Sequence, residues 1–214
     1  LKDTNEDEIY AVVLWTVERL VWGLRTLADR FGRVYVVSTF GNHGRQDRKP
    51  RAKTRAKRNA DWLIGRLVHS HLKADTRFSW NIPLSGDAYF RVFGHTYFAT
   101  HGDAIGVKGG DGIIGAIGPI MRGQIKTANA ESSVGRPFDT IVMGHWHQTL
   151  WLPQAIVNNC LKGYDEFARF FLRAPPSPPS QMLWFTHPKW GITARWEVML
   201  EGGVVAKESQ ETPW

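Results

Sequence analysis

Apolar residues over the first thirty positions recur at intervals of three and four, the spacing of one buried helix face. Acidic residues at Glu6, Asp7 and Glu8 precede most of this pattern, and negative charge favours the amino end of a helix. The chain then reaches Phe31-Gly32, where we expect the helix to end. A helix over 7–30 is therefore predicted, with a buried face formed by Ile9, Val12, Val13, Leu20, Leu24 and Leu27.

Residues 34–38 form an uninterrupted apolar run, which is typical of a strand buried on both faces. A second helix is predicted over 49–72, because Pro50 is tolerated in the first turn. The remaining chain alternates short extended runs with turn residues and has one more helical stretch. We predict strands at 78–82, 89–93, 96–100, 149–152, 155–157, 182–186 and 192–198, a further strand starting at 140, a helix near 120–130 and a helical turn at 163–172.

Three of the predicted strands end on amide or imidazole side chains. Asn42 and His43 follow the run at 34–38, His101 follows the run at 96–100, and His145 and His147 end the run that starts at 140. The carboxyl ends of strands in an α/β sheet are where ligands usually bind. Residues two apart on a strand point the same way, so the two imidazoles of His-x-His would face one ligand. One metal ion, or two adjacent ones, would explain the pattern.

The blocks Gly41-Asn42-His43-Gly44-Arg45, Thr100-His101-Gly102-Asp103 and Gly144-His145-Trp146-His147 resemble the last three blocks of the calcineurin-like metallophosphoesterases. Together with residues 157–166, they are most similar to the branch of that family common in phage genomes. The resemblance covers nearly all of the chain. It implies an α/β fold with the four-layer α-β-β-α metallophosphoesterase sandwich, in which two sheets face each other and helices lie outside.

Two blocks that begin the family pattern, Asp-x-His and Gly-Asp-x-x-Asp, are absent ahead of Gly41-Asn42-His43. Ser85-Gly86-Asp87 does not replace the second block, because it follows that motif and no aspartate stands at the required spacing. We therefore expect 1–214 to be a single metallophosphoesterase domain truncated at its amino terminus, with the N-terminal strands missing.

The resemblance also assigns roles to individual side chains. Asn42, His101 and His145 would hold one divalent metal ion, and His147 would contribute to a second. Nitrogen and amide-oxygen ligands suit Mn²⁺, Fe, Zn²⁺ or Ni²⁺ without distinguishing among them. His43 would be the catalytic histidine, placed near the leaving-group oxygen as a proton donor or charge stabiliser.

Two neighbouring charged residues have an open assignment. Arg45 would contact a substrate phosphate oxygen through its planar guanidinium, or it would be a solvated member of a basic run. Asp103 would orient a ligand imidazole from the second shell of a metal site, or it would cap the turn after Gly102.

The charge of the chain has a local source. Residues 45–58 carry eight arginines and lysines against Asp47 alone, which equals the formal net charge of +7 of the whole chain. A concentrated basic segment beside Gly41-Asn42-His43 favours a nucleic-acid or nucleotide substrate.

Composition indicates the number of domains, the absence of a membrane span and the cellular compartment to be expected. At 214 residues and 43% apolar content, the chain is long enough for one domain with a sizeable core. No run of about 18 apolar residues occurs, so no membrane span is expected. Cys160 is the single cysteine, so no internal disulfide is possible and a cytoplasmic location is the simpler expectation.

These features predict an enzyme that hydrolyses phosphoester bonds with metal ions, most readily a phosphodiester in a nucleic acid or nucleotide. The alternative is a catalytically inactive nucleic-acid-binding remnant that uses the basic segment 45–58. A third reading is one structural zinc on His101, His145 and His147, which is weaker because structural zinc usually recruits cysteines. The sequence leaves the oligomeric state open.

Overall fold

The computed structural model describes residues 8–49, 51–105, 117–162, 169 and 178–200. This part of the chain is a mixed α/β structure with several sheets, which confirms the predicted α/β class. Its helices are Ile9–Phe31 (α1), Ala60–Leu72 (α2), Ile117–Ser133 (α3) and the short 3₁₀ helix Ala56–Arg58 (η1). Its strands are Val34–Val37 (β1), Phe78–Asn81 (β2), Ala88–Val92 (β3), His95–Ala99 (β4), Thr140–Met143 (β5), Leu150–Leu152 (β6), Ala155–Val157 (β7), Ser180–His187 (β8) and Gly191–Met199 (β9).

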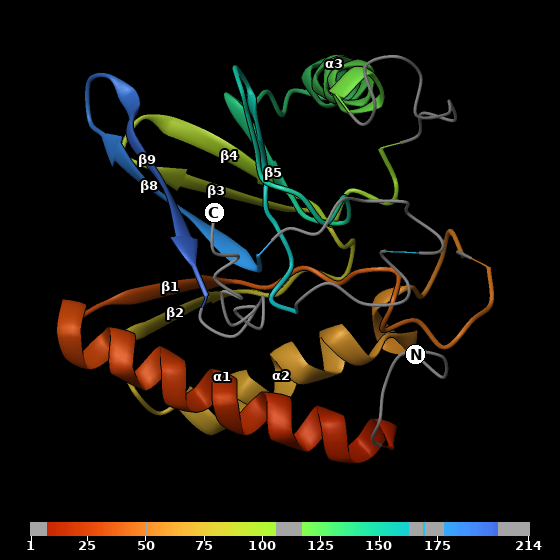
Figure 1. Cartoon of the computed structure of the whole chain (residues 1–214), viewed down its shortest axis with the longest axis vertical. Helices are drawn as coiled ribbons and strands as arrows, with labels where there is room; N and C mark the ends of the chain where they lie inside the picture. Colours follow the sequence, from red (N-terminus) through yellow and green to blue (C-terminus); the bar gives the residue numbers. More distant parts are fainter. Residues whose placement is uncertain (1–7, 50, 106–116, 163–168, 170–177, 201–214) are drawn as a thin grey trace, which may run out of the picture.

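Strands β1 and β2 form a parallel pair, with Val34 opposite Phe78 and Val37 opposite Asn81. Helices α1 and α2 pack against each other and cover this pair on one side (Figure 1). One face of each helix is buried against the strands, as the helical spacing of apolar residues predicts. Leu20 and Leu27, however, were predicted on the buried face of α1 and are 43% and 46% exposed. The core of this region contains Val17, Ala28, Val68, Leu72 and Phe78.

A second sheet has five strands in the order β3-β4-β5-β7-β6. Its central strands β4, β5 and β7 run parallel, whereas β3 and β6 are antiparallel edges. Helix α3 lies on the side of the molecule opposite to α1 and α2 (Figure 1). It packs on the sheet through Ile120, which is fully buried among Phe98, Ile105, Ile141 and Met143.

The antiparallel hairpin β8–β9 lies beside the five-stranded sheet (Figure 1). It is tied to β4 by polar contacts of the fully buried Tyr97. The Tyr97 hydroxyl lies 2.6 Å from Thr186 Oγ1, and Trp184 Nε1 donates to the same hydroxyl at 3.1 Å. These bonds satisfy a hydroxyl that would otherwise be buried at a cost.

The second helix begins later than the sequence pattern predicts. Asn59 has extended backbone angles, and its side chain accepts a hydrogen bond from the Asp61 N–H, so α2 starts at Ala60. The whole basic segment 45–58 therefore precedes α2, with its last residues in η1, and the prediction of a helix from residue 49 was wrong. The helical turn predicted at 163–172 lies almost entirely outside the described residues.

No helix in the described ranges combines the length and the apolar character needed to cross a membrane.

The edge of β1 that faces away from β2 has no paired strand within the described ranges.

Ile120 and Ile125 test how α3 is held, because one is buried and the other is 54% exposed on the same helix. We expect Ile120→Ala to lower the free energy of unfolding by roughly 2–5 kcal/mol, since it leaves a cavity against the sheet. The matched change Ile125→Ala should cost no more than about 0.5 kcal/mol. Urea denaturation of both variants measures the difference, and equal losses would contradict this packing.

Candidate functional site

The loop after β1 is held by the start of α2. Asn59 Nδ2 donates to the Gly41 carbonyl at 2.7 Å, and the Gly41 N–H donates to Asp61 Oδ2 at 2.9 Å. The Ala60 N–H also donates to the Gly44 carbonyl at 2.7 Å. Both backbone polar groups of Gly41 are therefore bonded to one helix end, which fixes the backbone next to Asn42.

Gly41 allows His101 to approach this loop closely. A Cβ atom at position 41 would lie 2.7 Å from His101 Cε1 and 2.8 Å from His101 Nδ1, closer than side chains tolerate. Gly44 is equally confined, because a Cβ there would collide with Asn59 and Asp61. The two glycines are thus required by packing, since only a residue without a side chain fits either position.

Asn42 and His101 meet across this contact, as their positions at strand ends predict. His101 Nε2 lies 2.8 Å from Asn42 Oδ1, and because the amide oxygen can only accept, the imidazole nitrogen is the donor. The His101 ring is 5.1 Å from the ring of His145, measured between centroids. Burial, reinforced by the nearby His145, lowers the pKa of His101 to about 4, so its imidazole is neutral near pH 7.

His145 and His147 reach the site by a route that strand alternation does not predict. Strand β5 ends at Met143, and both histidines have positive φ angles, 69° and 52°. The Gly144 N–H bonds the His101 carbonyl at 3.1 Å, and the Trp146 N–H bonds the Gly144 carbonyl at 2.8 Å. Two left-handed non-glycine residues in one short turn carry backbone strain, which is common at functional sites.

The side chains of this turn divide between the core and the site. Trp146 packs against the core of the five-stranded sheet. His147 lies with its ring 6.1 Å from that of His43, again between centroids. Partial burial, together with the cation of Lys162, lowers the pKa of His43. The five predicted metal and catalytic residues therefore lie close together in the fold. Asn42 contacts His101, His43 lies beside His147, and His145 lies beside His101.

The donor atoms can be compared with what a divalent ion requires. Two ligand atoms about 2.1 Å from one ion and at right angles lie about 3 Å apart, close to the 2.8 Å between Asn42 Oδ1 and His101 Nε2. To bind an ion through Nε2, His101 would carry its proton on Nδ1 instead. His145 Nδ1 is buried and lacks a hydrogen-bond partner among the described residues, as expected of a nitrogen with a lone pair to share. Across the described ranges, however, no three His, Cys, Asp or Glu side chains lie close enough together to hold one metal ion.

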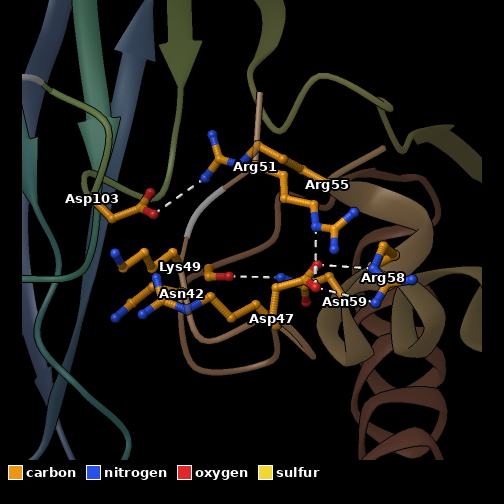
Figure 2. A pocket seen from close by; sticks show the side chains of 10 residues that line it. Asn42, Asp47, Lys49, Arg51, Arg55, Arg58, Asn59 and Asp103 are labelled. Atoms are coloured by element: carbon orange, nitrogen blue, oxygen red, sulfur yellow. Dashed lines mark hydrogen bonds and ion pairs between the residues drawn. The ribbon is translucent and has the colours of Figure 1, made fainter. Parts of the chain in front are cut away.

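A pocket lined by basic residues adjoins Asn42 (Figure 2). Arg45 lines it, and its role in substrate binding stays a prediction. Asp103 also lines it and forms an ion pair with Arg55, 3.2 Å between Oδ2 and Nη2. The Asp103 carboxylate therefore contacts a guanidinium and not an imidazole. Its negative charge still raises the pKa of His101 and of His145, against the stronger lowering by burial.

Asn59 and Asp61 belong to the site but were not among the residues predicted from the sequence, and Arg55 was predicted only as part of the basic segment 45–58. Asn59-Ala60-Asp61 carries a helix-start signal, because asparagine is a preferred capping residue and acidic residues favour the first turn. That signal predicts where α2 begins, but it does not predict that the start of α2 contacts Gly41. The pairing of Arg55 with Asp103 spans 48 positions and has no local signal.

No family model matches this chain, and neither a curated protein nor a solved structure is similar to it. Its function is therefore inferred from its own motifs and from the geometry above.

The lowered pKa of His101 predicts how stability depends on pH. The unfolded chain binds a proton at this imidazole near pH 6.5, whereas the folded chain does so only near pH 4. The free energy of unfolding should therefore fall as the pH drops from about 6.5 to about 4, by at most about 1.4 kcal/mol per pH unit from this group.

Urea denaturation between pH 4 and pH 7 measures this slope. His101→Gln should flatten it, whereas the same change at the exposed His71, on α2, serves as the control for loss of an imidazole. Equal slopes in the native protein and in His101→Gln would contradict the burial of a neutral His101.

Proposed function

We propose that this protein hydrolyses phosphoester bonds with the help of divalent metal ions, and that its substrate is a nucleic acid or nucleotide. The observation that carries the proposal is the meeting of Asn42, His101 and His145, from three segments distant in sequence, at the ends of β1, β4 and β5. Beside the amide–imidazole pair, His145 Nδ1 is buried without a hydrogen-bond partner among the described residues and stands in a strained turn, a combination that favours a functional role.

Asn42, His101 and His145 would hold one ion and His147 would contribute to a second, as the resemblance to the calcineurin-like metallophosphoesterases implies. Bound metal would shield the negative charge of a phosphoester and make hydroxide available near neutral pH. The neutral state favoured by the low pKa of His101 suits this role, because a protonated imidazole cannot be a ligand.

His43 would act on the leaving group. It is exposed, lies beside His147, and is not in the Asn42–His101 contact, so a substrate could reach it. Its lowered pKa favours the neutral imidazole near pH 7, whose N–H still donates a hydrogen bond to a developing oxyanion. We therefore assign it charge stabilisation at the leaving oxygen.

The arrangement of the elements is compatible with the four-layer sandwich that we propose for the fold. Helices α1 and α2 lie outside β1 and β2, and α3 lies on the far side of the five-stranded sheet (Figure 1). The Asp-x-His and Gly-Asp-x-x-Asp motifs of the family do not occur ahead of Gly41 in this sequence, so His147 is the single ligand assigned to the second ion.

His43 and His145 should respond differently to substitution. With bis-p-nitrophenyl phosphate and Mn²⁺, we expect His43→Ala to lower kcat by roughly 100-fold or more while bound metal is retained. His145→Ala should lose metal and activity together, because it removes a ligand. Elemental analysis beside the kinetics separates the two roles, and His71→Ala controls for loss of an exposed histidine.

Two results would count against these assignments. Loss of metal in proportion to activity in His43→Ala would make that residue a ligand. Absence of turnover in the native protein with Mn²⁺, Fe²⁺, Zn²⁺ and Ni²⁺ would remove the proposed activity.

A second candidate function is nucleic-acid binding without catalysis, through residues 45–58. The basic pocket favours it, as does the lack of a three-residue metal group among the described His, Cys, Asp and Glu residues. This function predicts that affinity for a DNA strand falls steeply between 50 and 200 mM salt, as counterion release requires. Anisotropy titrations with and without Mn²⁺ test it, since binding without cleavage would favour this candidate and cleavage would exclude it.

A further inference from the structure

The basic pocket beside Asn42 combines an unusual number of cations in a small space. Five cationic side chains and two carboxylates line it, which leaves three net positive charges (Figure 2). The lining residues are Gly41, Asn42, Arg45, Asp47, Lys49, Arg51, Arg55, Arg58, Asn59 and Asp103.

Three of the five cations are held by the two carboxylates. Arg58 binds Asp47 through two nitrogens, at 2.8 and 3.1 Å, and Arg51 Nε lies 3.1 Å from the same carboxylate. The hydrogen bond from Arg58 lowers the pKa of Asp47, so this carboxylate keeps its charge. These pairs fix the wall of the pocket nearest α2.

Arg55 forms the opposite wall. Its guanidinium pairs with Asp103 at 3.2 Å and lies 5.6 Å from the ring centre of Phe40, which is almost fully buried. Both members of the ion pair are largely buried, with 27% and 11% of their side chains exposed. A pair so shielded from water is less screened than an exposed one, so Arg55 is a stable part of the frame.

Arg45 and Lys49 differ from these three. Neither forms an ion pair with any carboxylate of the described residues, and Lys49 is exposed. Their charges are therefore available to a bound anion, whereas those of the paired arginines are partly neutralised. A guanidinium with an ammonium beside it is well suited to phosphate oxygens.

The pocket shares its boundary with the proposed hydrolytic site. Asn42 lines the pocket and also contacts His101, and Asp103 lies two residues after His101. An anion in the pocket would thus be a close neighbour of a phosphoester bound at the histidines. A substrate with one phosphate cannot occupy both places, whereas a nucleic-acid strand carries phosphates in succession.

We propose that the basic pocket binds a second phosphate group of the substrate, next to the phosphoester that is cleaved, through Arg45 and Lys49. This inference rests on the proposed function and narrows its substrate to a nucleic-acid strand or another nucleotide with two separate phosphates. Arg51, Arg55 and Arg58 hold the pocket open and contribute charge without being the main contacts.

Two substrates that differ by one phosphate test this inference. Thymidine 5′-(p-nitrophenyl phosphate) and its 3′-phosphorylated form release the same nitrophenol, and only the second carries an additional phosphate. In the native protein with Mn²⁺, we expect kcat/KM to be roughly ten-fold higher for the 3′-phosphorylated substrate, as one or two charge-assisted hydrogen bonds would give.

Lys49→Gln should reduce that preference at least five-fold, and Arg45→Gln should do the same. Lys73→Gln is the matched control, because Lys73 is an exposed lysine at the opposite end of α2, about 20 Å along the helix from Asn59. A native protein without preference for the second phosphate, or a preference equal in Lys49→Gln and Lys73→Gln, would overturn the proposal.

Binding separates a failure of this inference from a failure of the proposed activity. If neither substrate is cleaved, calorimetry with thymidine 3′,5′-bisphosphate and thymidine 5′-monophosphate still tests the pocket. Tighter binding of the bisphosphate, lost in Lys49→Gln and kept in Lys73→Gln, supports the pocket although hydrolysis has failed. Equal affinities of the two nucleotides in the native protein would overturn it.

Discussion

The hydrogen bonds that the start of α2 makes to Gly41 are the constraint on which the site depends. Asn59 and Asp61 satisfy the carbonyl and the N–H of Gly41, which belong to two consecutive peptide groups, so a shift of the loop after β1 would break both bonds. His101 then packs against a position where only glycine fits, and its imidazole meets Asn42. A helix end, a glycine and a strand end are thereby combined into one rigid arrangement.

The site also contains features that oppose stability. His145 and His147 adopt left-handed backbone angles, and His145 Nδ1 is buried without a partner among the described residues. Each such feature costs of order 1–3 kcal/mol, and proteins commonly retain features of this kind where function needs them. Trp146 packs on the core of the five-stranded sheet and holds the turn in place, although its buried indole N–H also has no partner among the described residues.

Ion pairing decides what the basic segment can do. The sequence shows eight equivalent cations between Arg45 and Arg58, but Asp47 and Asp103 hold three of them in fixed positions. Of the other five, Arg45 and Lys49 line the pocket and can serve an anion at the border of the imidazole cluster. Binding and hydrolysis are thus proposed to use one continuous surface.

The sequence by itself determined the elements whose signal is local. Helical spacing located α1, apolar runs located β1 and β5, and the same pattern placed amide and imidazole side chains at three strand ends. Hydrophobic periodicity reports which face of an element is buried, and that requirement is met within a few residues. The metal and catalytic roles of these side chains remain predictions.

Tertiary structure decided the rest. The start of α2 at Ala60 is an exception, because its causes are local: arginines and lysines four apart repel one another on a helix, and Asn59 caps the segment that follows them, a signal that the prediction of a helix from residue 49 overlooked. The turn at His145 and His147 replaces strand alternation, since Gly144 is bonded to the chain next to His101. Partners such as Arg55 and Asp103 lie 48 residues apart, and only the folded chain brings such charges together.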